Sequence, residues 1–392
     1  MTLFADPSFF VLLAVVLVPA AALGLTGHNL RRYALAVSVL FLSCAVCDQP
    51  WQALAVLAFL LVEWFALRLL ARDPGDGRRF AVATVLSLAP LVTYKVSLAA
   101  GGSLWGFVGI SYVTFKAVQV VVETRDGLIA PDALGLDDYL SFLLFFPQLS
   151  SGPIDRSRRF LADAHRTPGR DEYAGLLARG ILLLLAGATY YLVFATLAHR
   201  YMASVPWDAS DPVGSLATQV GQAWLYALYL FFDFAGYSLM AMGASYCLGI
   251  RCPRNFRAPF IARDLFDFWN RWNITLSTWL RDFVFMRLTR LIMRRHLIRD
   301  RVRTAQVALV ANMVVMGLWH GLTGDYVLYG IYHGVLLALT QGFQKRSRFY
   351  RRHRDDRWFR VLSWFVTLQL VVLGLAIFSG QLSTLVKGAL DV

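Results

Sequence analysis

Long apolar runs alternate with short polar loops along almost the whole chain. The runs in the first third are Phe9–Leu25, Tyr33–Cys47, Trp51–Leu70, Phe80–Ala99 and Trp105–Val122. A helix needs about 20 predominantly apolar residues to cross a bilayer, and these runs approach that length. The pattern therefore predicts a series of membrane-spanning helices.

The same pattern continues towards the C-terminus. Further spans are expected at Tyr173–Leu197 and Val361–Phe378, and two shorter apolar runs lie at Val307–Leu322 and Tyr326–Leu339. The run Val220–Ile250 is longer than one crossing requires and contains glycines, which predicts either one kinked helix or a span with a short return. No polar linker divides the chain, so we expect a single domain over residues 1–392.

Two segments do not fit a simple crossing. Leu140–Leu149 is too short to span and is expected to form a re-entrant or interfacial piece. Arg251–Arg303 is the least membrane-like region, and its second half alternates arginines with apolar residues. Such a basic amphipathic helix lies at a membrane surface or docks an acidic partner. The predicted fold class is an all-α polytopic membrane protein.

Composition agrees with a membrane protein and explains the charge. The chain is 57% hydrophobic and 16% charged, with a net charge of +13, whereas soluble domains are about a quarter charged. The strongly basic loops, such as Arg31–Arg32 and Arg72–Arg79, alternate along the chain with loops that carry no positive charge, such as Asp48–Pro50 and Gly101–Ser103. The positive-inside rule then places the basic loops in the cytoplasm and the N-terminus outside. The excess charge therefore indicates topology, with an added partner surface left open, and not nucleic-acid binding.

Phe9–Leu25 lacks a basic segment before it, so we interpret it as a retained helix and not as a signal peptide. The common nucleotide and hydrolase motifs are absent. No spacing of histidines and carboxylates suggests a metal, and the four cysteines are scattered. We therefore expect neither a metal nor a bound cofactor.

Two histidines lie in or beside apolar runs. His320 follows the apolar stretch Val314–Leu318 and has Trp319 and Gly321 as neighbours. An ionisable group there usually faces a cavity or a partner, and a neutral imidazole can act as a general base. The alternative is a histidine that only packs a helix. His333 is either an orienting group for His320 or a packing residue.

A polar cluster threaded with tryptophans lies at residues 269–282. Taken as helix, Asn273, Ser277 and Arg281 share one face. This face either lines a polar passage, in which Asn273 binds a carbonyl oxygen or an acceptor hydroxyl, or faces water on an interfacial helix. Arg281 and Asp282 are expected to make separate contacts and not one ion pair.

Three segments resemble the membrane-bound O-acyltransferase (MBOAT) superfamily, and within it the D-alanyl transfer (DltB) branch. They are "FFPQLSSGPIDRSRRF" (Phe145–Phe160), "FWNRWNITLSTWLRDFVFMRL" (Phe268–Leu288) and "MGLWHGLTGDYVLYGIYHG" (Met316–Gly334). Alginate O-acetyltransferases share "LSTWLRD" and "WHG" but usually carry an "AGPI"-type middle motif, so "SSGPIDR" favours the D-alanyl branch. The resemblance implies an MBOAT-type multi-helix bundle with re-entrant and interfacial helices and opposed cytoplasmic and extracellular funnels.

The resemblance also implies a reaction and partners. The branch moves D-alanine from a carrier-protein phosphopantetheine thioester across the bacterial cell membrane, for O-acylation of a cell-envelope polymer such as teichoic acid. Implied partners are an acidic D-alanyl carrier protein (DltC-like) on the cytoplasmic side, a DltD-like partner on the envelope side, and membrane lipid. The alternatives are an exopolysaccharide O-acetyltransferase of the same superfamily, or a non-catalytic scaffold or transporter.

By this resemblance His320 matches the superfamily's characteristic histidine. Branch members commonly have histidine where this chain has Asn273; since asparagine cannot be a base, Asn273 would position or stabilise while His320 transfers the proton. The expected catalytic residues are His320 and Asn273, and the expected tunnel or orienting residues are Trp319, His333, Ser277, Trp279, Arg281, Asp282, Ser151 and Pro153. Expected carrier-docking residues are Arg287, Arg290, Arg294, Arg295 and Arg299.

Overall fold

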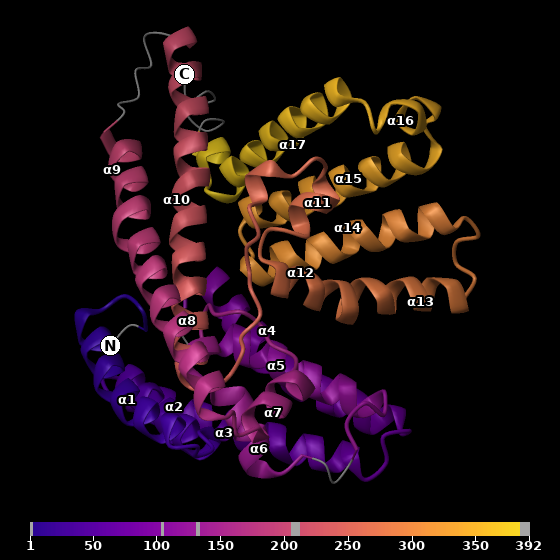
Figure 1. Ribbon diagram of the computed structural model, residues 1–392. Coiled ribbons are helices and arrows are strands. Elements are labelled where there is room, and N and C mark those ends of the chain that lie inside the picture. The colour runs from indigo at the N-terminus through magenta and orange to yellow at the C-terminus, as the bar shows by residue number, and fades with distance from the viewer. Residues whose placement is uncertain (1–2, 103–105, 131–133, 205–211, 385–392) are drawn as a thin grey trace. The chain divides into compact units, whose positions relative to one another are not determined.

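The computed structural model describes residues 3–102, 106–130, 134–204 and 212–384, except for the side chains of 212–216. Within these ranges the chain forms helices and no strand, which confirms the all-α fold class (Figure 1). Among the described residues, seven helical stretches are long and apolar enough to cross a membrane. They are Pro7–Leu25, Pro50–Ala71, Gly77–Ala99, Arg170–Ser204, Ala217–Cys247, Arg301–His320 and Arg357–Phe378.

The described residues group into two compact units. Unit 1 comprises residues 1–188 and 236–254, and unit 2 comprises residues 189–235 and 255–392. The expected single domain over residues 1–392 stays a prediction.

Unit 1 contains the first eight α-helices and the second part of a ninth. Its helices are α1 Pro7–Leu25, α2 Arg31–Val46, α3 Pro50–Ala71, α4 Gly77–Ala99, α5 Ile110–Arg125, α6 Leu136–Leu144, η1 Phe146–Gln148, α7 Ser157–His165 and α8 Arg170–Thr189, with the end of α10 Pro212–Cys247. The 36-residue α10 is one continuous helix, so Val220–Ile250 forms one long helix as far as Cys247 and not a span with a short return.

Two of the predicted early spans form helices shorter than a crossing requires. α2 and α5 each have 16 residues, which is below the length that crosses a bilayer perpendicular to its plane. Trp105, where the fifth apolar run starts, lies outside the described residues. Burial explains the apolar character of α5, because nearly all of its residues are enclosed by the rest of unit 1.

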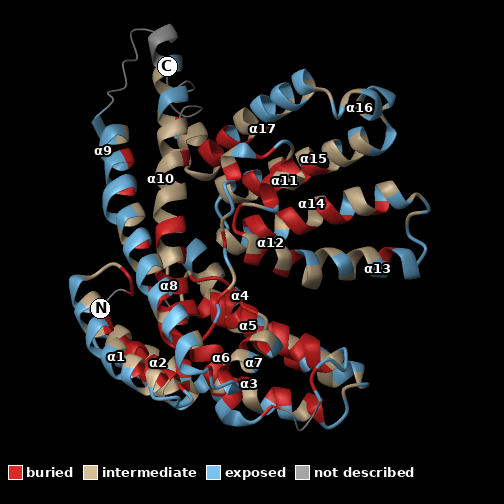
Figure 2. Ribbon diagram, viewed as in Figure 1, coloured by how far each residue is buried: buried red, intermediate tan, exposed pale blue. Residues whose placement is uncertain are grey.

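Other helices of unit 1 leave large apolar side chains on the surface. Val18 on α1 and Leu61 and Phe65 on α3 are each about 70% exposed (Figure 2). Soluble proteins rarely expose such continuous apolar faces. In a bilayer these faces contact lipid, so their exposure follows from the membrane environment.

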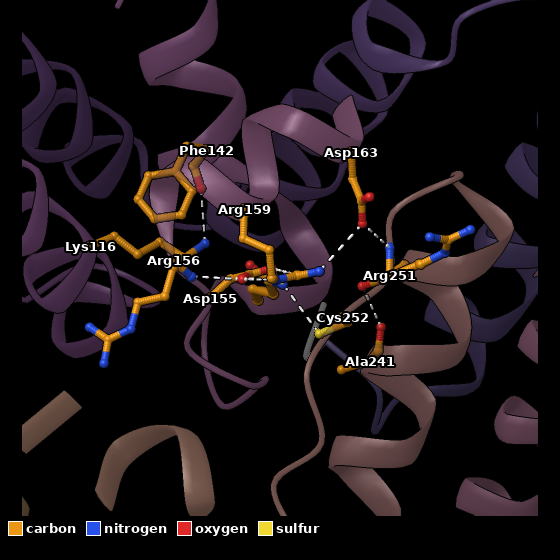
Figure 3. A network of polar contacts seen from close by, with 11 residues as sticks. Lys116, Phe142, Asp155, Arg156, Arg159, Asp163, Ala241, Arg251 and Cys252 are labelled. Atoms are coloured by element: carbon orange, nitrogen blue, oxygen red, sulfur yellow. Dashed lines mark hydrogen bonds and ion pairs between the residues drawn. The ribbon is translucent and has the colours of Figure 1, made fainter. Parts of the chain in front are cut away.

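A buried polar network supports the segment that carries the motif "SSGPIDR" (Figure 3). The Asp155 carboxylate is 1% exposed; it accepts hydrogen bonds from the Arg159 guanidinium at 2.7 Å and the Arg156 backbone N–H at 2.6 Å. The Lys116 ammonium, also fully buried, donates to the Phe142 carbonyl at 3.0 Å. Because buried charges need such partners, this part of the motif fixes the loop after η1.

Unit 2 contains the residues of the two other motifs. Its helices are η2 Tyr190–Ala195, α9 Thr196–Ser204, the start of α10, η3 Pro259–Ile261, α11 Leu265–Trp269, α12 Ile274–Leu280, η4 Arg281–Phe285, α13 Met286–Arg294, α14 Arg301–His320, α15 Gly324–Arg346, α16 Arg348–His353 and α17 Arg357–Phe378. α12, η4 and α13 follow one another as a rod, and α14 returns beside it (Figure 1).

Glycines bring α14 and α15 into close contact. A Cβ on Gly317 would lie 2.3 Å from the Tyr326 carbonyl oxygen, and one on Gly330 would lie 2.6 Å from the Met313 carbonyl oxygen. Small residues at such spacings let two helix backbones approach closely in a membrane. This contact fixes the end of α14, where His320 lies three residues after Gly317.

Candidate active site

His320 is the last residue of α14, and aromatic rings surround it. Its ring centroid lies 4.9 Å from that of Phe378, with the two ring planes nearly perpendicular, 4.4 Å from Trp319 and 6.0 Å from Tyr326. The side chain is half-buried. Since α14 has 20 residues and a helix rises about 1.5 Å per residue, His320 lies roughly 30 Å along the axis from the basic end of the helix.

Asn273 starts α12 with a left-handed backbone, at φ 42° and ψ 52°. It therefore precedes the helix, and the expected helical face of Asn273, Ser277 and Arg281 keeps only its last two members. Asparagine, aspartate and histidine adopt this conformation more readily than other side chains with a Cβ. The side chain is 5% exposed and its amide makes no hydrogen bond to another described residue, so the amide is free for a ligand.

A cavity of about 190 Å³ lies between the α12–η4 rod and α14. Its walls include Ser277, Arg281, Met313 and Met316; the other lining residues are Phe266, Trp269, Asn270, Thr278, Leu280, Phe285, Leu309, Asn312, Leu337 and Gln341. We call it the inner cavity. The π-helical turn η4 forms part of its wall, and such turns are frequent at functional sites.

The two expected catalytic residues do not line the inner cavity, but each lies one helical turn beyond a residue that does. Asn273 is one helical turn before Ser277, whose backbone N–H donates to the Asn273 carbonyl at 2.9 Å. His320 is one turn after Met316. Because the rod begins at Asn273 and α14 returns antiparallel to end at His320 (Figure 1), both residues lie beyond the same end of the shared wall.

Several buried polar atoms of the inner cavity lack partners. The indole nitrogen of Trp269, Oδ1 of Asn312 and Oε1 of Gln341 make no hydrogen bond within the described part of the chain. Buried polar groups are normally paired, and leaving one unpaired costs about 1–3 kcal/mol. One donor and two acceptors along a narrow cavity suit a ligand that carries amide groups.

The neighbouring charged pair corrects one expectation. Arg281 Nε lies 2.9 Å from Asp282 Oδ1, so these residues do form an ion pair with each other. The π-helical geometry of η4 accompanies this contact between adjacent residues. Trp279 is buried, and its ring centroid lies 4.9 Å from that of Phe283.

His333 is separated from His320 by the ring of Tyr329. It is fully buried, its ring centroid is 4.7 Å from that of Tyr329 and 5.3 Å from that of Trp269, and neither ring nitrogen has a hydrogen-bond partner among the described residues. Tyr329 in turn lies 6.3 Å from His320. His333 thus reaches His320 through Tyr329, and the choice between orienting and packing roles stays open.

Some of these neighbours were missed from the sequence. Tyr326 and Tyr329 belong to a quoted motif, but they lie on α15, the helix after the one that His320 ends, so a helical spacing rule does not connect them with His320. Phe378 comes from α17, and nothing in the sequence indicates its contact with His320.

Ser151 and Pro153 belong to unit 1, apart from the other expected tunnel residues in unit 2. Ser151 is half-buried and Pro153 buried. A Cβ on the intervening Gly152 would lie 2.2 Å from the Pro147 carbonyl oxygen, so this turn requires glycine. A structural role explains the motif within unit 1, and a tunnel role for these two residues stays a prediction.

The expected docking arginines lie on and just after α13. Arg290, Arg294, Arg295 and Arg299 are exposed, while the Arg287 guanidinium lies 6.0 Å from the ring centroid of Phe283. The nearby Asp300 accepts a hydrogen bond from the Val302 N–H and pairs with Arg346, and these contacts hold the pKa of the Asp300 carboxyl below its usual value. Because Asp300 pairs with Arg346, it does not offset the charge of the exposed arginines on and just after α13, and their surface keeps a strong positive excess.

Over the described residues, no group of three or more histidine, cysteine, aspartate or glutamate side chains is arranged to hold a metal. The arrangement offers instead one imidazole, one free amide and a narrow cavity with unpaired polar atoms. These groups suit proton transfer and the binding of a developing oxyanion.

Comparison with known proteins agrees with this chemistry. Residues 29–379 match the model of the membrane-bound O-acyltransferase family. The chain is 36% identical over 397 residues to the teichoic acid D-alanyltransferase of Bacillus subtilis (strain 168), covering 97% of this chain and 98% of that protein. A Streptococcus thermophilus protein of the same name is 36% identical over 401 residues, covering 97% and 96% of the two chains. The probable alginate O-acetylase AlgI of Pseudomonas aeruginosa is 31% identical over 278 residues, covering 70% of this chain and 49% of that protein. The chain thus belongs to the membrane-bound O-acyltransferase family and is a multi-pass membrane acyltransferase.

Proposed function

We propose that this protein transfers a D-alanyl group from the phosphopantetheine thioester of a carrier protein to a hydroxyl acceptor on the way to a cell-envelope polymer. The observation that carries the proposal is that His320 and Asn273 each lie one helical turn beyond a residue of the inner-cavity wall, where α14 ends and the rod begins. The near-complete match to teichoic acid D-alanyltransferases supports D-alanine as the acyl group. The bacterial relatives support a location in a bacterial cell membrane, and the basic loops support an N-terminus on the outside.

The phosphopantetheine arm fits the inner cavity chemically. The arm is a narrow chain with two amides, and Trp269, Asn312 and Gln341 offer one unpaired donor and two unpaired acceptors. The arm belongs to the carrier, so this chain needs no cofactor of its own.

The reaction then needs one base and one oxyanion donor. The His320 imidazole takes the proton of the acceptor hydroxyl, and the oxygen attacks the thioester carbonyl. The carbon–sulfur bond breaks, the proton returns to the leaving thiolate, and the ester forms. The Asn273 amide donates to the carbonyl oxygen while it is negatively charged.

Three substitutions of Asn273 separate its backbone and side-chain roles. Aspartate tolerates the left-handed backbone but has no N–H, whereas histidine tolerates it and keeps a donor. We expect Asn273→Asp to slow transfer by about 10²–10³-fold, as loss of one oxyanion donor does, and Asn273→His to keep most of the rate. Initial rates of D-alanyl transfer and thermal unfolding of Asn273→Asp, Asn273→His and Asn273→Ala check this. A wild-type rate for Asn273→Asp would show that only the backbone matters.

The carrier would dock on the exposed arginines on and just after α13. Carrier proteins are acidic, so opposite charge steers their association and screening by salt weakens it. We expect the triple change Arg290→Glu, Arg294→Glu and Arg299→Glu to weaken carrier binding by about tenfold or more and to remove most of its salt dependence. Titration of labelled carrier against the reconstituted protein at several salt concentrations measures this.

A matched control reverses charges elsewhere. Arg351→Glu with Arg352→Glu on α16 alters two exposed arginines of another basic stretch. If this control weakens carrier binding as much as the α13 variant, docking is not specific to α13, and the arginines of α13 serve topology.

A second candidate is O-acetylation of an exopolysaccharide. The similarity to probable alginate O-acetylases supports this activity, although this chain matches only about half of the length of those proteins. The two candidates share His320 and the ester chemistry and differ in the acyl donor. In the D-alanyl proposal, an envelope-side partner receives the alanyl group.

A further inference from the structure

Unit 2 contains a second and larger cavity of about 580 Å³, which we call the outer cavity. It lies between the first part of α10 and the C-terminal end of α17. Its lining residues are Gln219, Val220, Gln222, Ala223, Trp224, Gln369, Val372, Leu373, Ala376, Ser379, Gly380, Gln381, Leu382 and Thr384. It shares no lining residue with the inner cavity, and its volume is typical of ligand sites.

The wall of the outer cavity is joined to the surroundings of His320. Phe378, whose ring touches His320, lies directly before Ser379 and two residues after Ala376, both in the cavity wall. The Ser383 hydroxyl also donates to the Asp325 carboxylate at the start of α15. The outer cavity is therefore next to Phe378, one of the aromatic rings that surround the His320 imidazole.

The lining is mostly apolar, and its polar groups are uncharged. It contains four glutamine amides, two hydroxyls and one indole, and none of its side chains is ionisable. Amides and hydroxyls both donate and accept hydrogen bonds, so they match the hydroxyls of a sugar. A phosphate would find no cation among these residues. Val372, Leu373 and Ala376 add an apolar strip that suits a hydrocarbon chain.

Gln369 is an independent indication of a ligand. It lies in the middle of α17, within the apolar sequence "TLQLVVLGL", and is half-buried. Its amide makes no hydrogen bond to another described residue. A polar side chain at this depth is costly unless it has a partner, so the amide needs a group that the described chain does not provide.

The charge pattern assigns the cavity to the outer half of the membrane. α17 begins at a basic end with Arg357 and Arg360, which the positive-inside rule places in the cytoplasm. Gln369, Ser379 and Gln381 lie progressively farther from that end. A lipid in the outer leaflet could therefore reach the cavity.

We propose that the outer cavity binds the uncharged, hydroxyl-bearing head group of an outer-leaflet glycolipid, with the start of its hydrocarbon chain on the apolar strip. The site would hold the lipid anchor of the acceptor beside His320. This role rests on the proposed function, whereas binding itself does not.

Native mass spectrometry of the full chain tests binding. The protein is released from vesicles of neutral lipid doped with glucosyl diacylglycerol, with diacylglycerol or with phosphatidylglycerol. We expect retention of the glycolipid and at least about tenfold less retention of the other two, because several hydrogen bonds to the sugar are lost in diacylglycerol and a phosphate is left unpaired. Equal retention of phosphatidylglycerol, or no retained lipid, would overturn the proposal.

Variants locate the site. Gln369→Leu removes the amide, Ala223→Leu fills the cavity from α10, and Gln52→Leu on α3 is the control, since it removes an amide that lines neither cavity. Glycolipid retention should fall about tenfold or more in the first two variants and stay unchanged in the control. Because Gln369→Leu and Ala223→Leu change different helices, the same loss of retention in both would not be explained by misfolding of one variant. Unchanged retention in both would place the lipid elsewhere.

The outcome is separable from that of the proposed function. Loss of glycolipid retention without loss of D-alanyl transfer would remove the acceptor role of the cavity and leave the transfer reaction standing. Glycolipid retention by a protein that transfers no D-alanine would leave the binding site standing and overturn the proposed function.

Discussion

Replacing His320 by alanine is expected to slow D-alanyl transfer by about 10²–10⁴-fold, which is the usual contribution of a positioned general base. His333 is fully buried and separated from His320 by Tyr329, and the Asn273 side chain cannot accept a proton at neutral pH. The half-buried ring ends its helix, so its loss should leave folding nearly unchanged. Initial rates with a D-alanyl carrier in liposomes measure the effect.

His199→Ala is the matched control for His320→Ala. His199 lies on α9 in the same unit, and its ring centroid is 5.3 Å from that of Tyr229. The control should keep the wild-type rate, and both variants should unfold near the wild-type temperature. A His320→Ala protein that turns over at the wild-type rate would show that His320 is only a packing residue.

Replacing Gly330 by valine is expected to destabilise the protein strongly. A Cβ at this position would lie 2.6 Å from the Met313 carbonyl oxygen and 3.1 Å from Cα of Val314, so α14 and α15 must separate. Overpacking a tight contact costs about 1–3 kcal/mol or more. Because α14 carries His320, transfer should fall with stability. Thermal unfolding in detergent and the transfer rate measure both effects.

Gly324→Ala gives the comparison on the same helix. Nothing lies within 4 Å of a Cβ at Gly324, so this variant should unfold and react like the wild type. If Gly330→Val does the same, the close approach of α14 and α15 does not position the site.

Local sequence signals were sufficient for the membrane fold. Apolar runs of the right length predicted most of the spanning helices, because the hydrocarbon thickness sets helix length directly. The same rule failed for α5, since a helix buried in protein is as apolar as one that faces lipid. The three motifs predicted the family, and the family match over residues 29–379 confirms it.

The site was predictable only in part. His320 stood out because an ionisable residue beside an apolar run is costly. The left-handed backbone of Asn273 and the Arg281–Asp282 ion pair depend on how α12 and η4 begin, and a helical spacing rule does not contain that information. The contact between His320 and Phe378 depends on the packing of α17. The two cavities likewise depend on tertiary structure.

The identity of the acyl donor decides most directly what this protein does. The purified chain in liposomes would receive either radiolabelled D-alanyl carrier protein or radiolabelled acetyl donor, together with a hydroxyl-bearing glycolipid and the envelope-side partner. We expect label to appear in a base-labile ester only from the D-alanyl carrier, and not with His320→Ala. Ester label from the acetyl donor alone would contradict D-alanyl transfer and support the acetyltransferase.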